Sequence, residues 1–103
     1  MSRPILHLIL HVLVPGAVAR LAFADRWLRA WLIMLLTMVI DLDHLLATPI
    51  YDPDRCGIGF HPLHSDVAIG VYCILALIPA SRIVGVGLLI HMLLDGIDCV
   101  FMP

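Results

Sequence analysis

The chain has 103 residues, of which 62% are hydrophobic and only 14% are charged. Ordinary soluble domains carry about 25% charged residues, so this composition indicates a membrane protein with no room for an additional soluble domain. The net charge of −2 comes without a basic patch, which excludes nucleic acid as a main partner.

Four apolar runs follow one another along the chain, and their lengths suit helices that cross a bilayer. We predict helices over residues 4–23, 28–50, 62–78 and 83–101. The segment 51–61 between the second and third runs is rich in Pro, Asp and Gly, which is typical of a loop. The predicted fold is an all-α, integral membrane four-helix bundle that forms a single domain over residues 1–103.

The arginines indicate how such a bundle is oriented. Four spans place alternate connectors on opposite sides, with Arg20, Arg26, Arg29 and Arg82 on one side and Arg3 and Arg55 on the other. The larger group marks the cytoplasmic side, so both termini and the loop face outward. We therefore predict a multi-pass protein of the bacterial inner membrane whose outer face meets the periplasm.

All six histidines and most of the aspartates fall in four short clusters within or beside the apolar runs. These clusters are His7/His11, Asp41/Asp43/His44, His61/His64/Asp66 and His91/Asp95/Asp98. Ionisable groups at membrane depth are costly unless they are paired, hydrated or bound to a cation. In the predicted topology all four clusters lie toward the outer face, so we predict one shared site there.

The spacing within the clusters suits metal ligation. Residues three or four apart on a helix share a face, as in His91 and Asp95. Asp41 and Asp43, close together at an apolar helix end, would repel and desolvate each other without a nearby cation. The predicted ligands are His7, His11, Asp41, His44, His61, His64, His91 and Asp95.

The ligand types indicate the metal. Mixed imidazole and carboxylate donors suit Zn²⁺, Mn²⁺ or Fe²⁺, and the chain has no paired cysteine motif for a thiolate or iron–sulfur site. We predict one or two divalent ions, with Zn²⁺ favoured. The number of candidate ligands favours a dinuclear site, in which one ion acidifies a water and both stabilise charge on a displaced oxygen.

Three motifs carry a resemblance to a known family: Asp41-Leu42-Asp43-His44, His61-Pro62-Leu63-His64-Ser65 and His91-Met92-Leu93-Leu94-Asp95. With the N-terminal histidine before them, they resemble small inner-membrane proteins described as membrane-bound metal-dependent hydrolases. Those are distantly similar to the zinc-dependent phospholipase C and single-strand nuclease superfamily, whose all-helical folds hold a zinc cluster. The resemblance covers nearly the whole chain and implies that the metal ligands are His11, Asp41, His44, His64, His91 and Asp95.

These observations lead to a functional hypothesis with alternatives. The hypothesis is a hydrolase in which a metal-bound hydroxide attacks an ester or phosphoester of a lipid-like substrate, with Asp43 or Asp98 as general base. The alternative is a non-catalytic metal protein, such as a carrier, store or sensor, or one in which metal only stabilises packing. Haem ligation by a histidine pair would leave the aspartates unexplained. A groove beside an open coordination position would favour the hydrolase.

Structural roles that need no metal also remain open for several of these residues. His7 and His11 could be an interfacial polar pair, His61 could cap a helix, and His91 could form a neutral hydrogen bond with Asp95. The sequence leaves homo-oligomerisation open, and membrane lipids are the expected surroundings.

The three cysteines form no metal motif. Cys56 and Cys99 both fall near the predicted outer face, where an oxidising compartment would allow a disulfide between the loop and the fourth helix. We predict that Cys73 is a buried apolar filler.

Overall fold

The computed structural model describes residues 2–102, and every regular element in that range is helical. The α-helices are α1 (Arg3–Ala22), α2 (Trp27–Leu36), α3 (Asp66–Leu77) and α4 (Arg82–Val100). The 3₁₀ helices are η1 (Ala24–Arg26), η2 (Thr37–Leu46), η3 (Pro62–His64) and η4 (Pro79–Ser81). Since η2 directly continues α2, the molecule has four main helical segments. The all-α prediction is confirmed for the described residues.

Local sequence signals explain several of the helix ends. Pro4 lies in the first turn of α1, where its fixed φ is favourable and its missing N–H would have no helical partner. The Ser65 hydroxyl accepts a hydrogen bond of 3.2 Å from the Ala68 N–H and so caps the start of α3. Ile78 is extended at the end of α3, as expected for a residue that precedes a proline.

Two predicted helices differ from the observed ones. The second was predicted over residues 28–50, but its helical stretch ends at Leu46 and bends follow. Thr48 precedes a proline, which disfavours helical backbone there. The third was predicted over 62–78, but Ser65 takes an extended conformation as the cap and separates η3 from the 12-residue α3. Both interruptions leave irregular backbone beside predicted site residues.

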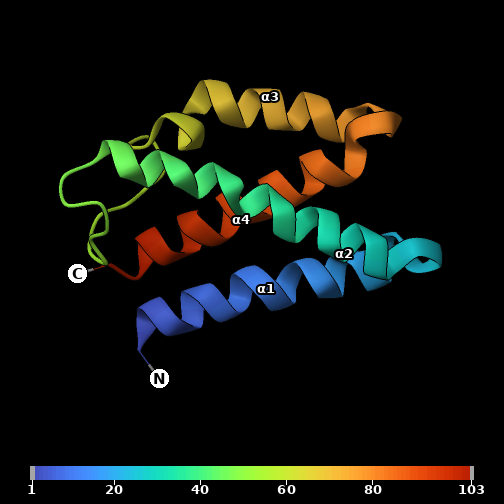
Figure 1. The fold of residues 1–103 in the computed structure, drawn as a ribbon, viewed down its shortest axis with the longest axis horizontal. Coiled ribbons are helices and arrows are strands. Elements are labelled where there is room, and N and C mark those ends of the chain that lie inside the picture. The colour runs from blue at the N-terminus through green and yellow to red at the C-terminus, as the bar shows by residue number, and fades with distance from the viewer. Residues whose placement is uncertain (1, 103) are drawn as a thin grey trace.

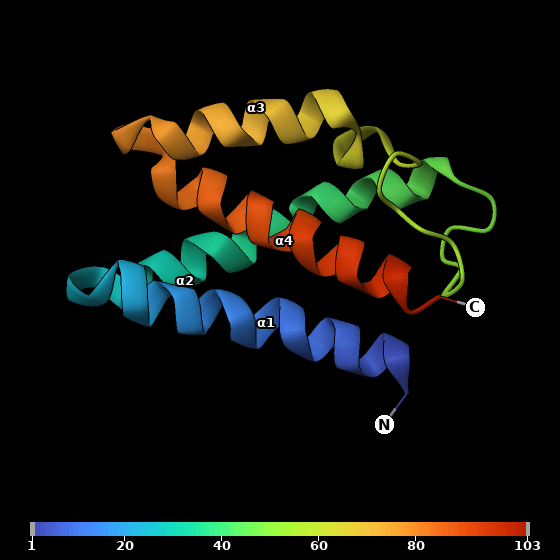
Figure 2. The ribbon, with the colours of Figure 1, turned by 180° about the vertical axis from the view of Figure 1, so that it is seen from behind.

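The central element of the bundle is α4, with α1 and α2 on one side and α3 on the other (Figures 1 and 2). One core cluster joins α1, α2 and α4 and includes Met34 and Leu94. A second joins η2, α3 and α4 and includes Ile40 and Leu88. Both chain ends and the loop after η2 lie at the same end of the bundle (Figure 1). This arrangement brings all four predicted clusters to that end.

The outer surface of the bundle is strongly apolar. Leu21, Leu46, Val67 and Val100 are each more than three-quarters exposed. Surfaces of this kind mark contact with lipid or with a partner. The segments Arg3–Ala22 and Pro79–Val100 are both long and apolar enough to cross a membrane.

The prediction that Cys73 is buried is wrong, because this thiol is exposed. Its position on α3 explains the difference. This helix packs on α4 through residues such as Tyr72, which is buried, while the neighbouring Val71 and Cys73 turn outward. The apolar helix α3 therefore has one face that no other helix covers, which the composition alone could not reveal.

Candidate metal centre

The structure brings the predicted site residues together at the end of the bundle that carries the loop. His7 and His11 come from α1, and Asp41, Asp43 and His44 come from η2. His61 and His64 come from the connection before α3, and His91, Asp95 and Asp98 come from α4. Asp66, in contrast, lies exposed in the first turn of α3. Nine of these residues form three groups, two of which share Asp95, and Asp98 flanks them.

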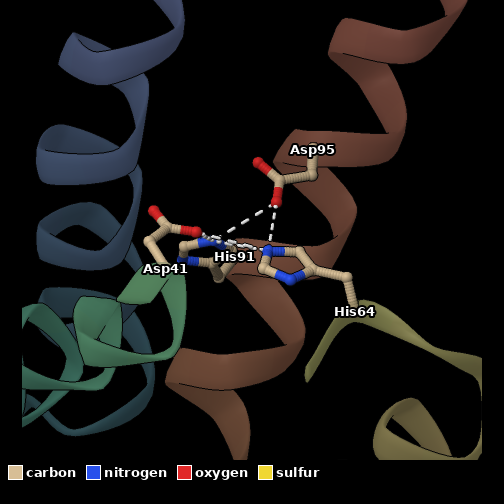
Figure 3. Close-up of side chains that lie close together, drawn as sticks. All are labelled: Asp41, His64, His91 and Asp95. Atoms are coloured by element: carbon tan, nitrogen blue, oxygen red, sulfur yellow. Dashed lines mark hydrogen bonds and ion pairs between the residues drawn. The ribbon is translucent and has the colours of Figure 1, made fainter. Parts of the chain in front are cut away.

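The central group consists of Asp41, His64, His91 and Asp95, and Figure 3 shows their side chains converging. His64 Nε2 lies 3.3 Å from Asp41 Oδ1 and 3.0 Å from Asp95 Oδ2. His91 Nε2 lies 3.0 Å and 3.2 Å from the same two oxygens. The two imidazole Nε2 atoms are only 3.4 Å apart. Two nitrogens and two carboxylate oxygens therefore point at one small volume, which is the donor pattern of a divalent metal site.

A second group adjoins the first through Asp95. Its Oδ1 atom lies 3.0 Å from His7 Nε2 and 3.0 Å from His11 Nε2, while its Oδ2 atom faces His64 and His91. The two oxygens of one carboxylate thus serve two pairs of imidazoles. This is the arrangement in which one carboxylate can bridge two metal ions.

A third group contains Asp43, His44 and His61. The His44 and His61 rings stack with centroids 3.9 Å apart. His44 Nδ1 donates to the Asp41 carbonyl oxygen at 2.9 Å and lies 3.2 Å from Asp43 Oδ1. These three residues form the side of the site nearest to the loop.

Asp43 has a distinct position behind the central group. Its carboxylate is buried, and its Oδ2 atom accepts hydrogen bonds from the Leu63 N–H at 3.0 Å and from His64 Nδ1 at 2.9 Å. A carboxylate that holds Nδ1–H of a histidine leaves Nε2 free to act as a ligand and fixes the ring orientation. His11 is oriented in a similar way, because its Nδ1 donates to the His7 carbonyl oxygen at 2.8 Å. Both rings therefore present Nε2 to the groups described above.

The carboxylates around His64, in the connection before α3, favour a positive charge at this position. Burial by itself would lower the pKa of His64, but hydrogen bonds to Asp41, Asp95 and Asp43 outweigh it and raise the pKa to about 10. His61 differs, because burial and the neighbouring His44 lower its pKa. Without a metal ion the carboxylates thus hold a proton on His64. A divalent cation could replace that proton and balance more of the negative charge.

A cavity of about 390 Å³ opens beside the three groups. Metal-site residues in its wall are His7, Asp41, His44, His61 and Asp95. Asp98 also lines the cavity, with Oδ2 3.9 Å from His7 Nδ1, whereas Asp43 does not. Five of the eight predicted ligands are therefore reachable from a space that a small molecule could enter, whereas His11, His64 and His91 do not line it.

The loop side of this cavity is tied to α4. A disulfide joins Cys56 to Cys99 with a Cα–Cα distance of 5.0 Å. The predicted possibility of this pairing is thus realised in the structure. Sequence reasoning used Arg55 only for orientation and gave no role to Tyr51, although both line the cavity. Their position within the predicted outer loop, 51–61, was the one available signal.

The fold and the site together define an all-helical protein with imidazole and carboxylate groups gathered at one end. The chain belongs to DUF6122, a family of unknown function whose model matches residues 1–102. No curated protein and no solved structure matches it. The resemblance to metal-dependent hydrolases therefore stays a prediction from the motifs.

Proposed function

We propose that this protein is a membrane-embedded, metal-dependent hydrolase with a dinuclear centre. The observation that carries the proposal is the Asp95 carboxylate, which is shared by two imidazole pairs and lies in the wall of a cavity. An ion pair with a purely structural role needs neither a carboxylate shared by two imidazole pairs nor access from a cavity.

The residues fit two divalent ions. One ion would be held by Asp41, His64, His91 and Asp95, and the other by His7, His11 and Asp95. Nitrogen and oxygen donors in sets of three or four suit Zn²⁺, and a set of three protein ligands is typical of catalytic zinc sites. Mn²⁺ and Fe²⁺ suit the same donors. Of the three cysteines, two are joined in the disulfide and none belongs to the groups.

Each part of the site has a proposed role in hydrolysis. Divalent ions supply an acidified water and stabilise charge on a displaced oxygen. Asp98 lines the cavity and is not a member of the three groups, so it is placed to accept a proton from a water molecule there. Asp43 is buried behind His64, which makes it a positioning residue in this proposal rather than a general base.

The surroundings of the site support a lipid-like substrate. The bundle exposes a large apolar surface, and the site lies at the end where α1 begins and α4 ends. In a multi-pass orientation with the arginine-rich end in the cytoplasm, the cavity opens near the outer headgroups of the inner membrane. An ester or phosphoester of an amphiphile would meet the metal ligands there.

Hydrolysis by the purified protein tests this proposal. The protein in detergent is stripped with a chelator, reloaded with Zn²⁺, and assayed with p-nitrophenyl esters and bis(p-nitrophenyl) phosphate. We expect metal-dependent turnover that Asp98→Asn reduces about 100-fold or more while metal content is unchanged. A fully metal-loaded protein that cleaves neither substrate class would contradict the hydrolase proposal.

A non-catalytic metal protein is the second candidate. The observation that favours it is the burial of His64 and His91 in the central group, because an enclosed ion can serve storage or packing. Rapid, reversible metal exchange without turnover would support this function. Metal-dependent turnover that is lost with Asp98→Asn would exclude it.

A further inference from the structure

Among the described residues 2–102, Arg55 is the one arginine in the wall of the cavity. Its Nη2 atom donates to the Ile50 carbonyl oxygen at 3.2 Å, and its guanidinium lies over the Phe60 ring at 4.7 Å from the centroid. Within residues 2–102 it has no carboxylate within 4.0 Å. Arg3 at the same end of the bundle differs, because it pairs with Asp54 at 2.9 Å and approaches Asp98 at 3.6 Å.

The missing ion pair is informative because acidic groups are abundant nearby. Asp41, Asp52, Asp95 and Asp98 all line the same cavity, yet none of them pairs with Arg55. A guanidinium carries five N–H donors in a planar fork, which matches the oxygens of phosphate or carboxylate groups. Arg55 thus keeps N–H donors in the cavity wall that no carboxylate of the described residues engages.

The backbone around Arg55 is fixed relative to the metal ligands. The next residue, Cys56, forms the disulfide with Cys99 near the end of α4. Asp95 and Asp98 lie four residues and one residue before Cys99 on that helix. The disulfide therefore fixes the loop carrying the arginine to the helix that carries the shared carboxylate. Stacking on Phe60 further restricts the side chain.

The remaining wall of the cavity is suited to an apolar group. It includes Pro4, Leu8, Ile50 and Met102. Its volume of about 390 Å³ lies within the range of about 300–1,000 Å³ that is typical of small-molecule sites. One cavity therefore combines metal ligands, a cation and an apolar wall.

We infer that Arg55 binds the anionic oxygens of a phosphate-bearing amphiphile whose ester bond lies against the metal ligands. This inference rests on the proposed function and narrows its substrate class from an ester or phosphoester to a phosphoester. With metal bound, the residues that would hold it and the Arg55 guanidinium would both face the phosphate in this cavity, and the apolar wall would contact the hydrocarbon part. A neutral ester would offer the guanidinium no anionic oxygen and would therefore gain less from Arg55 than a phosphate would.

Phosphate binding by the Zn²⁺-loaded protein in detergent tests the inference. Inorganic phosphate and dihexanoyl phosphatidic acid are each titrated by calorimetry into the wild type and into Arg55→Gln, Arg55→Lys and Arg29→Gln. Arg29 is exposed at the other end of the bundle and serves as the matched control. We expect Arg55→Gln to weaken the binding of both ligands about 10- to 100-fold, which is the loss expected for charged hydrogen bonds. Arg55→Lys should lose less, and Arg29→Gln should leave the affinity unchanged.

The metal content of each variant separates a failure of this inference from a failure of the proposed function. Tighter binding of the lipid than of free phosphate identifies a headgroup as the source of the anion, and equal affinities identify free phosphate. An Arg55→Gln protein with full metal content and wild-type phosphate affinity overturns this inference alone. A wild-type chain that binds no metal overturns the proposed function and this inference together.

Discussion

Replacing Asp43 with asparagine tests how the metal centre is oriented. The Asp43 carboxylate accepts hydrogen bonds from the Leu63 N–H and from His64 Nδ1, and its other oxygen lies 3.2 Å from His44 Nδ1. An asparagine oxygen could keep the bonds to Leu63 and His64. Its amide group would then face His44 Nδ1, which already donates to a backbone carbonyl. Asp43→Asn therefore removes the negative charge behind His64 and places two donors opposite each other.

The expected loss follows from the role of such carboxylates. Residues that orient a metal-ligating histidine contribute about 10- to 100-fold to metal affinity, which is about 1.4–2.8 kcal/mol. Competition with a chelating dye of known Zn²⁺ affinity, in detergent, measures this directly. Asp66→Asn is the matched control, since Asp66 is exposed and outside the three groups. Equal Zn²⁺ affinity in Asp43→Asn and in the control would refute the reasoning.

Three other predictions concern the packing, the loop and the proton balance. A Cβ atom at Gly85 would lie 2.3 Å from a backbone nitrogen of α3, so Gly85→Ala should cost about 1–3 kcal/mol of stability in thermal unfolding. Gly70→Ala, where the added atom meets nothing within 4 Å, should stabilise the protein slightly, and equal effects would contradict this packing. The disulfide spans 43 residues, so Cys56→Ser with Cys99→Ser should lower the free energy of unfolding by about 4 kcal/mol, and an unchanged melting temperature would contradict this. Because the pKa of His64 is raised from 6.5 to about 10, the metal-free protein holds this proton at pH 7, and Zn²⁺ binding should release it and weaken as the pH falls. Calorimetry in buffers of different ionisation enthalpy measures that release, and a value of zero would contradict it.

The sequence predicted the convergence of the site because helical spacing and alternating topology were sufficient. His7 and His11 share a face of α1, and His91 and Asp95 share a face of α4, as their separation of four residues requires. The even number of helical segments then places these faces at the same end of the bundle. No longer-range information was needed for that part.

The different roles of the aspartates in the site depend on tertiary contacts and could not be predicted from the sequence. Asp43 and Asp98 were equal candidates for a general base, since each is an aspartate beside a metal-ligand motif. Only the packed structure buries one behind His64 and exposes the other to the cavity. The position of Arg55 is likewise set by a disulfide and an aromatic contact between segments that sequence spacing does not relate.

The count of metal ions per chain, with and without the shared carboxylate, tests the central claim most directly. Purified protein in detergent is equilibrated with Zn²⁺, desalted and analysed by mass spectrometry of the elements, alongside Asp95→Asn and the control Asp66→Asn. Two zinc ions in the wild type and in the control, with one or none in Asp95→Asn, is the result we predict. Stoichiometric zinc that is unchanged in Asp95→Asn, or no zinc in the wild type, would contradict a centre built around Asp95.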